Sequence, residues 1–320
     1  MKYQPDSPVA GAEIAPAGMH ISVLTSGGEW HERLETPSRP ANVVLRLAAL
    51  IRAHAGQPTS ESRVGLAVWG TVDPRSGVVY TLRNASTWDH FPLATELELS
   101  TARSVYLISA PSAAALAEAR YGAGAGYDTV LYLSLDQTVS TSLVSHGAIV
   151  NGKPGSEYAI AHYPSELSNR RCSCGQYGHI EPVASAQSLV RNFIGKAADS
   201  DASTGAMLQL SHGRAEALSP HLVFRLAADG DEAAQAVVGD ALTSLASGLA
   251  TVLGREGASV VIIGGPVAAA GALLTVPLLQ LLVTRLSAGI PAPDIQPAML
   301  GKRGVLIGAA LAADIRQVHG

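Results

Sequence analysis

The sequence predicts an α/β protein made of two lobes that share one plan. Strands and helices alternate along the chain, which is typical of α/β folds. A pair of neighbouring strands opens each half, at residues 11–24 and 29–36 in the first half and within residues 127–150 in the second. The chain has 320 residues, which is long enough for two domains with substantial cores.

The elements between these strands follow from the spacing of apolar residues. Residues 42–54 place Val43, Leu47 and Ile51 on one helical face, and residues 64–68 have the pattern of a buried strand. A strand at 105–109 leads into a helix that ends near residue 120. Further helices are predicted at residues 185–197, 213–229 and 231–253, and a further strand at 259–263.

One uncharged run, residues 258–283, is long enough to cross a bilayer. However, it begins with a β-branched stretch, breaks at Gly264-Gly265-Pro266 and continues as an alanine- and leucine-rich segment. This order favours a buried strand, a tight turn and a buried helix, so no association with a membrane is predicted.

The composition excludes some classes of function. The formal net charge is −4 and 15% of the residues are charged, so the chain lacks the basic surface expected of a nucleic-acid-binding protein. Direct binding of nucleic acid is therefore not expected. The first residues contain no apolar core of a secretory signal, and we expect the protein in the cytoplasm.

The two cysteines lie in a segment that also carries two histidines. His162, Cys172, Cys174 and His179 form a Cys2His2 set, which suits tetrahedral zinc and leaves no open position for catalysis. The sequence therefore predicts a structural zinc site. Two alternatives remain: a strained disulfide between the cysteines, or two free thiols beside unrelated surface histidines.

This segment resembles the zinc segment of the ROK family (repressors, open reading frames and sugar kinases), whose pattern is GExGH, nine further residues and CxCGxxGCxE. Here His179 replaces the third cysteine, which keeps a zinc donor, and Ala159 replaces the glutamate of GExGH. The resemblance extends over nearly the whole chain, and it implies a terminal helix at residues 304–315.

The resemblance implies an actin/hexokinase-like (ribonuclease H-like) duplicated fold with a zinc-binding knot and a ligand cleft between the lobes. The expected lobes are residues 1–112 with 305–320, and residues 113–304, which include the knot at 162–181. It also implies a homo-oligomer.

The position of the family's catalytic base is occupied by an alanine. The segment 105–120 resembles the family's strand and helix with the motif NDxNxxAxxE, and Ala110 stands where that aspartate takes the proton of the sugar hydroxyl. A methyl group cannot accept a proton, and general-base catalysis contributes about 10²–10⁴-fold. Ser109 and Ser112 replace the asparagines, and we expect them to cap the following helix.

Both segments that resemble the family's phosphate loops have lost their glycines. Glu13 to Ala17 align with DxGGT and include Pro16, which has no N–H to donate to a phosphate. Residues 136–142 align with GTGxGGG but contain no glycine, and Asp136 adds a carboxylate. The glycines that resemble the family's adenosine-packing pair, Gly264 and Gly265, are retained.

The resemblance also suggests residues for binding a small sugar. Asn84 begins a segment similar to PNLxxW, His162 and Glu181 match the family's sugar-facing histidine and glutamate, and Glu157 lies two residues before the lost glutamate. On a strand, a spacing of two would place Glu157 on the same face.

Together these features predict a catalytically inactive sugar-kinase homologue, a pseudokinase-like regulator that binds a sugar or a partner. The altered loops argue against ATP and Mg²⁺ as its ligands. Two alternatives stay open. One is an ATP-dependent, glucokinase-like kinase of a hexose or N-acetylhexosamine. The other is a ROK-type transcriptional regulator without its DNA-binding domain, since the first strand begins close to the start of the sequence.

Overall fold

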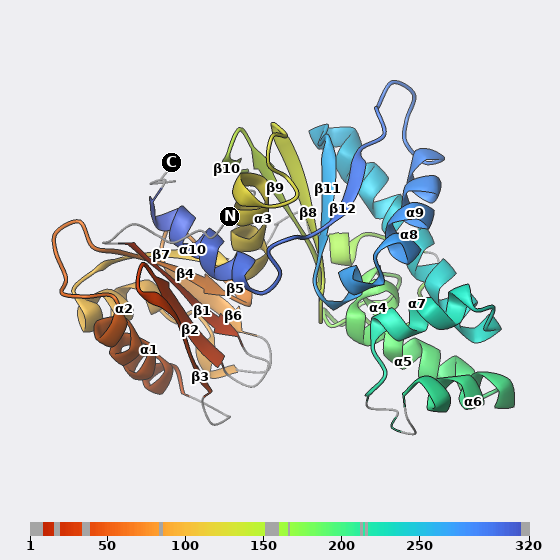
Figure 1. The fold of residues 1–320 in the computed structure, drawn as a ribbon, viewed down its shortest axis with the longest axis horizontal. Helices are drawn as coiled ribbons and strands as arrows, with labels where there is room; N and C mark the ends of the chain where they lie inside the picture. The colour runs from red at the N-terminus through yellow and green to blue at the C-terminus, as the bar shows by residue number, and fades with distance from the viewer. Residues whose placement is uncertain are drawn as a thin grey trace. The chain divides into compact units, whose positions relative to one another are not determined.

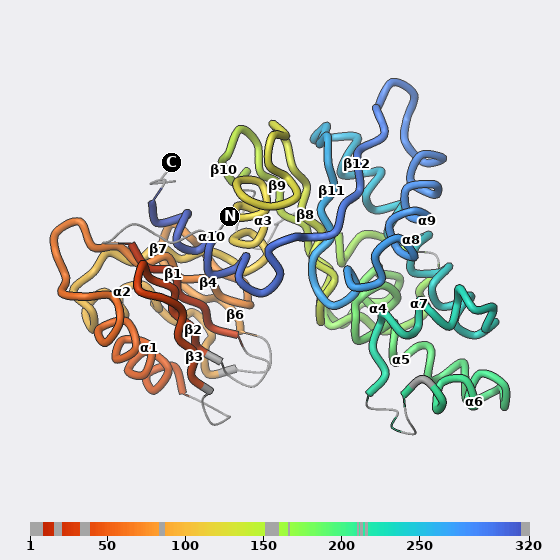
Figure 2. Tube along the Cα trace, viewed as in Figure 1, coloured from red at the N-terminus to blue at the C-terminus, as the bar shows by residue number. Residues whose placement is uncertain are grey.

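The computed structural model describes residues 9–15, 20–33, 39–82, 86–150, 160–165, 167–211, 214 and 217–314. The chain forms two compact units (Figures 1 and 2). Unit 1 comprises Met1–Asp128, Ser142–Glu157 and Met299–Gly320, and unit 2 comprises Thr129–Thr141 and Tyr158–Ala298.

The sheet of unit 1 has five strands in the order β3-β2-β1-β4-β7. These strands are β1 (Val9–Ala15), β2 (His20–Thr25), β3 (Gly28–Arg33), β4 (Arg63–Val68) and β7 (Ser104–Ser109). The first three form an antiparallel meander, whereas β1, β4 and β7 run parallel. The carboxyl ends of β1, β4 and β7 therefore lie at one edge of the sheet.

Helices cover both faces of this sheet. In Figure 1, α1 (Pro40–His54) and α2 (Leu93–Thr101) lie on one side and α10 (Arg303–Asp314) on the other. α10 also packs on α3 (Ala110–Tyr121). α10 approaches α3 closely because Gly308 has no side chain. A Cβ on Gly308 would lie 1.7 Å from the carbonyl oxygen of Ala113.

The packing of α3 on α10 explains why the unit boundaries differ from the lobes predicted at residues 112–113 and 304–305. α3 and the residues up to Asp128 group with unit 1. Unit 1 also contains a small two-stranded ladder of β5 (Gly70–Asp73) and β6 (Val78–Leu82), followed by the 3₁₀ helix η1 (Ser86–Trp88).

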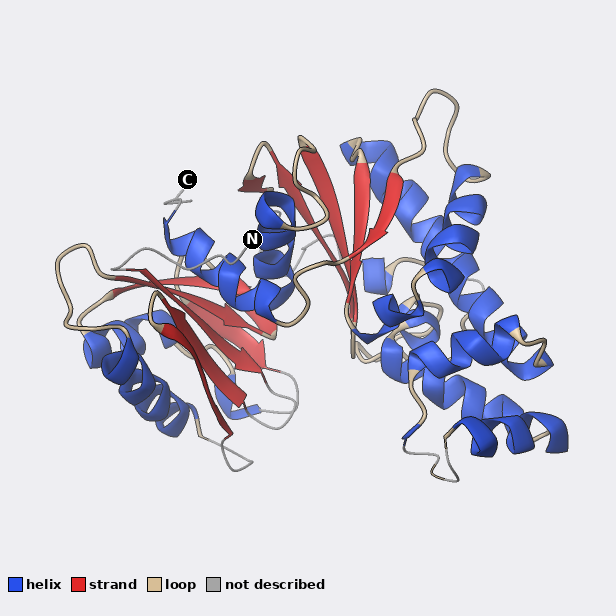
Figure 3. Cartoon of the chain, viewed as in Figure 1, coloured by secondary structure: helices blue, strands red, loops and turns tan. Residues whose placement is uncertain are grey.

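A second five-stranded sheet repeats the strand order of the first. Its order is β10-β9-β8-β11-β12, with β8 (Thr129–Leu135), β9 (Val139–Ser145), β10 (Ala148–Ile149), β11 (Val260–Gly264) and β12 (Asp294–Pro297). β11 runs parallel to both β8 and β12, as β4 does to β1 and β7. The predicted α/β class is confirmed, and the two sheets share one plan (Figure 3).

Unit 2 adds a group of helices. They are η2 (Ile160–His162), α4 (Glu181–Ala184), α5 (Ala186–Ala197), α6 (Asp201–Leu210), α7 (Pro220–Ala228), α8 (Glu232–Glu256), η4 (Pro266–Ala270) and α9 (Ala272–Val283). Side-chain caps at Ser185, Ser200, Ser219 and Asp231 start four of them. The uncharged run at 258–283 forms β11, η4 and α9, as predicted.

Among the described residues, α8 is the helix long and apolar enough to cross a membrane. It packs against α4, α5, α7 and α9, and 61% of its most apolar window is buried. This burial is typical of a core helix in a water-soluble protein.

Candidate functional site

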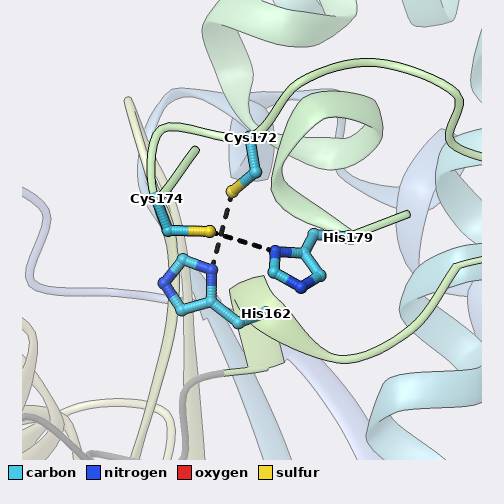
Figure 4. Close-up of side chains that lie close together, drawn as sticks. All are labelled: His162, Cys172, Cys174 and His179. Atoms are coloured by element: carbon cyan, nitrogen blue, oxygen red, sulfur yellow. Dashed lines mark hydrogen bonds between the residues drawn. The ribbon is translucent and has the colours of Figure 1, made fainter. Parts of the chain in front are cut away.

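The predicted metal ligands converge on one loop of unit 2. His162 ends η2, and Cys172, Cys174 and His179 lie in the segment between η2 and α4. Figure 4 shows the four side chains pointing toward one another. Isolated bridges join Pro164 to His179 and Arg171 to Tyr177, and they fold the segment back on itself. Gly175 and Gly178 adopt φ values of 94° and 78°, which favour glycine.

The distances within this cluster suit a tetrahedral metal. Cys172 Sγ lies 3.5 Å from His162 Nδ1, and Cys174 Sγ lies 3.3 Å from His179 Nδ1. The four ligand atoms all lie within 4.8 Å of one another. Zinc bonds of about 2.3 Å to sulfur and 2.0–2.1 Å to nitrogen give a sulfur–nitrogen separation of about 3.6 Å in a tetrahedron. Both cysteines are free, so the donors fit zinc and the disulfide alternative does not apply here.

Glu181 lies beside this cluster. Its Oε1 accepts hydrogen bonds from Cys172 Sγ at 3.7 Å and from Ser173 Oγ. Burial raises the pKa of the Cys172 thiol, and the Glu181 carboxylate raises it further. A bound cation would lower the pKa of Cys172, because it stabilises the thiolate.

The structure places two of the four predicted sugar-binding residues together. His162 and Glu181 both approach Cys172, the histidine through Nδ1 and the glutamate through Oε1. Asn84 and Glu157 lie outside the described residues.

Ala110 is the first residue of α3 and is buried. Ser109 caps this helix: its Oγ accepts from the N–H of Ser112 at 3.3 Å and donates to Ser112 Oγ at 2.9 Å. Ser112 Oγ also lies 3.1 Å from Ser142 Oγ. The predicted role of Ser109 as a helix cap is confirmed, and Ser112 supplies the capped N–H.

A half-buried carboxylate in unit 1 was not recognised from the sequence. Glu13 Oε1, on β1, accepts a 2.7 Å hydrogen bond from Trp69 Nε1, just after β4. Burial raises the pKa of Glu13. The signal available was an acidic residue in an otherwise apolar strand, in register with Ala67 two residues before the tryptophan.

The two predicted phosphate segments differ in what the structure describes. Residues 16–19 after β1, which include Pro16, lie outside the described residues. The second segment forms a turn in which Asp136 N–H donates to the carbonyl of Thr138 at 3.0 Å. The Asp136 carboxylate accepts from Gln137 N–H at 2.7 Å.

This turn borders a surface pocket of about 490 Å³ in unit 2. The pocket is mostly apolar, and it is lined by Asp136, Gln137, Ala186, Gln187, Val190, Arg191, Ile194, Leu218, Pro220 and Pro266. Gly264 and Gly265 directly precede Pro266, which lines the pocket. A Cβ on Gly264 would lie 1.8 Å from Tyr132 Oη, and Gly265 has a φ of 85°. These glycines allow β11 to pack against β8 and the chain to turn toward Pro266.

Comparisons with known proteins agree over nearly the whole chain. The model of the ROK family matches residues 18–315. A glucokinase of Thermotoga maritima is 30% identical over 283 residues, which cover 87% of this chain and 88% of the relative. An N-acetylmannosamine kinase of Shigella flexneri is 26% identical over 95% of this chain and 98% of its own length.

The fold comparison gives the same result. The crystal structure of a ROK family glucokinase from Streptomyces griseus in complex with glucose and AMPPNP matches with a TM-score of 0.77 and 26% identity. The match covers 96% of this chain and 99% of that chain.

These relatives are named as kinases, which contradicts the prediction of an inactive, pseudokinase-like regulator. The prediction rested on three short segments, whereas the similarity to kinases extends over the whole fold. The chain belongs to the ROK family.

Proposed function

We propose that this protein is an ATP-dependent sugar kinase that phosphorylates a hexose or an N-acetylhexosamine. The observation that carries the proposal is the 30% identity to a glucokinase over 87% of the chain. The match to a glucokinase solved with glucose and AMPPNP supports the same pair of substrates.

The chemistry of phosphoryl transfer is compatible with an alanine at position 110. The transition state is loose, and catalysis depends mainly on positioning and on stabilising the charge of the transferred group. A general base contributes about 10²–10⁴-fold, which is a fraction of a kinase's total acceleration. The loss of one base would therefore lower the rate without changing the class of reaction.

The pocket in unit 2 is our proposed site for the base of the nucleotide. Its apolar lining suits a planar purine, and Gly264 and Gly265 bring Pro266 to its wall. Mg²⁺ would enter with ATP as part of the substrate complex.

We also propose that His162, Cys172, Cys174 and His179 hold a structural Zn²⁺ ion. Their separations match a tetrahedral site, and four protein ligands leave no coordination position for a substrate. The ion would fix the segment from η2 to α4, which also carries Glu181.

The remaining parts of the proposal rest on the family. Asn84, Glu157, His162 and Glu181 are proposed to face the sugar. A homo-oligomer in the cytoplasm is proposed on the same basis.

A coupled assay of ADP release tests the proposed function. Purified protein with Mg-ATP is assayed against glucose, mannose, N-acetylglucosamine and N-acetylmannosamine, with a reaction lacking sugar as the control. Release that depends on one of these sugars is expected. Equal rates with and without every sugar would contradict the proposal.

A further inference from the structure

The carboxyl ends of β1, β4 and β7 form the edge of unit 1 at which ligands of α/β sheets bind. Glu13 on β1 is in register with Ala67 on β4, which is in register with Ile108 on β7. Trp69 follows Ala67 by two residues and Ala110 follows Ile108 by two. Glu13 therefore lies at the same edge as the alanine that begins α3.

Trp69 fixes the direction of the Glu13 side chain. The 2.7 Å hydrogen bond from its indole N–H to Glu13 Oε1 ties the carboxylate to the segment that follows β4, the strand between β1 and β7. Glu13, on β1, and Ala110, directly after β7, therefore flank this segment at the same edge of the sheet.

The surroundings of Glu13 make its carboxylate a stronger proton acceptor than an exposed glutamate, because its pKa is raised. Burial raises its pKa, and the indole N–H limits this rise. The charged groups around it are His31 and Glu29 from β3 and Lys302 before α10. Glu29 is already paired with His31 at 3.1 Å and with Arg303 at 2.7 Å.

Two other carboxylates of unit 1 are committed to local structure. Asp73, at the end of β5, accepts from Ser76 Oγ at 2.7 Å and from Arg75 N–H at 3.0 Å, and the hydrogen bonds lower its pKa. Glu118, on α3, accepts from the N–H groups of Ala123 and Leu300. Neither lies at the carboxyl ends of β1, β4 and β7, where Glu13 lies.

We propose that Glu13, oriented by Trp69, is the general base that takes the proton of the acceptor sugar hydroxyl. This inference rests on the proposed kinase function. The hydroxyl oxygen forms a bond to the γ-phosphorus of ATP, the bond from that phosphorus to the β,γ-bridging oxygen breaks, and its electron pair leaves with ADP. The hydroxyl proton passes to Glu13 and then to water.

The Glu13→Gln variant tests this role, because the amide oxygen can still accept the hydrogen bond from Trp69. The kcat of Glu13→Gln is expected to fall by about 10²–10⁴-fold. The wild-type kcat should rise with pH through the raised pKa of Glu13 to a plateau, and this rise should be absent in the variant. Glu96→Gln, which replaces an exposed carboxylate on α2, is the control and should change kcat by less than about twofold.

Trp69→Phe provides a second readout. Removing the indole N–H takes away a group that stabilises the ionised carboxylate, so the rising limb of the pH profile should move to higher pH with a similar plateau. A merely structural role of Trp69 would lower kcat at every pH and leave the limb in place.

The outcomes separate the two proposals. If the wild-type protein phosphorylates a sugar and Glu13→Gln, folded by circular dichroism, keeps its kcat and its rising limb, the assignment of Glu13 is overturned while the kinase function stands. A variant that keeps the limb and only requires more Mg²⁺ also overturns it, because the carboxylate then serves the metal. A wild-type protein without sugar-dependent ADP release overturns the kinase function, and the inference with it.

Discussion

His162, Cys172, Cys174 and His179 bring four donors that zinc prefers within 4.8 Å of one another, in a segment tied by two isolated bridges. A segment of this kind has little apolar surface of its own, and a metal would supply its folding energy. The first prediction at the scale of residues concerns this cluster.

The His179→Ala variant should lose stoichiometric zinc and melt at a lower temperature. A loss of 1 kcal/mol lowers the melting temperature of a domain of this size by roughly 2–4 °C, so the shift is measurable by calorimetry together with metal analysis. His90→Ala, which replaces an exposed histidine of unit 1, is the control and should keep both properties. Zinc-free wild-type protein with an unchanged melting temperature would refute the site.

The second residue-scale prediction concerns Asp136 at the rim of the unit 2 pocket. The Asp136→Asn variant removes the charge but keeps an oxygen that can accept the Gln137 N–H. If the phosphates of ATP approach this turn, the KM for ATP should fall by about tenfold, which is about 1.4 kcal/mol of relieved repulsion. Gln187→Ala, in the same pocket, controls for a general change of shape. An unchanged KM in Asp136→Asn would place the phosphates elsewhere.

At this scale the sequence identified the four side chains that form the Cys/His cluster, because they lie within one short segment. It missed the pair of Glu13 and Trp69, because its two members are 56 positions apart and meet only through the parallel register of β1 and β4. Position 110 was recognised as an alanine, but its consequence for activity was overestimated.

At the scale of elements, α10 is the helix whose fit is most sensitive to volume. A Cβ on Gly308 would lie 1.7 Å from the carbonyl oxygen of Ala113, whereas the nearest neighbour of a Cβ on Gly304 would lie at 3.4 Å. The two glycines are one helical turn apart and differ in their contacts.

Gly308→Ala should therefore lower the free energy of unfolding by about 1–3 kcal/mol, the usual cost of overpacking. Gly304→Ala should leave it unchanged or raise it by up to about 1 kcal/mol, because alanine is the better helix former. Urea unfolding of both variants gives the comparison. Equal stabilities would contradict the close packing of α10 on α3.

Sequence patterns predicted the helices whose apolar residues repeat clearly. The expected helix at 304–315 is α10, and the expected helix at 231–253 is α8. The helix expected at 213–229 begins only at Pro220, and α6 was not expected at all. α6 contains Ser203, Thr204 and Gly205, which have low helix propensity, and its start depends on the cap supplied by Ser200.

At the scale of the whole molecule, the half-buried carboxylate of Glu13 couples stability to pH. Its pKa is raised in the folded protein, so its contribution is fully present below the unfolded pKa and is lost as pH rises through the folded pKa. A pKa difference of one between the folded and unfolded states corresponds to about 1.4 kcal/mol.

Glu13→Gln removes this coupling. The variant should gain stability relative to the wild-type protein as pH rises from the unfolded pKa of Glu13 through its raised folded pKa, as measured by urea unfolding at each pH. A constant difference across this range would show that Glu13 titrates alike in the folded and unfolded protein.

The repeated strand order of the two sheets was predictable, since a pair of strands opens each half of the sequence. The similarity to named kinases was given too little weight, because three altered segments suggested a lost function while the rest of the chain kept that similarity. Residues that pack the fold outnumber those expected to contact substrate, so a comparison over the whole chain includes information that the three short segments lack.

The central claim is that this chain transfers a phosphoryl group from ATP to a sugar. The most direct measurement is ³¹P nuclear magnetic resonance of a reaction with Mg-ATP and the sugar that gives the highest ADP release. The account predicts a new sugar phosphate resonance that grows as the γ-phosphate resonance of ATP declines. Formation of inorganic phosphate alone, or a spectrum that does not change, would contradict it.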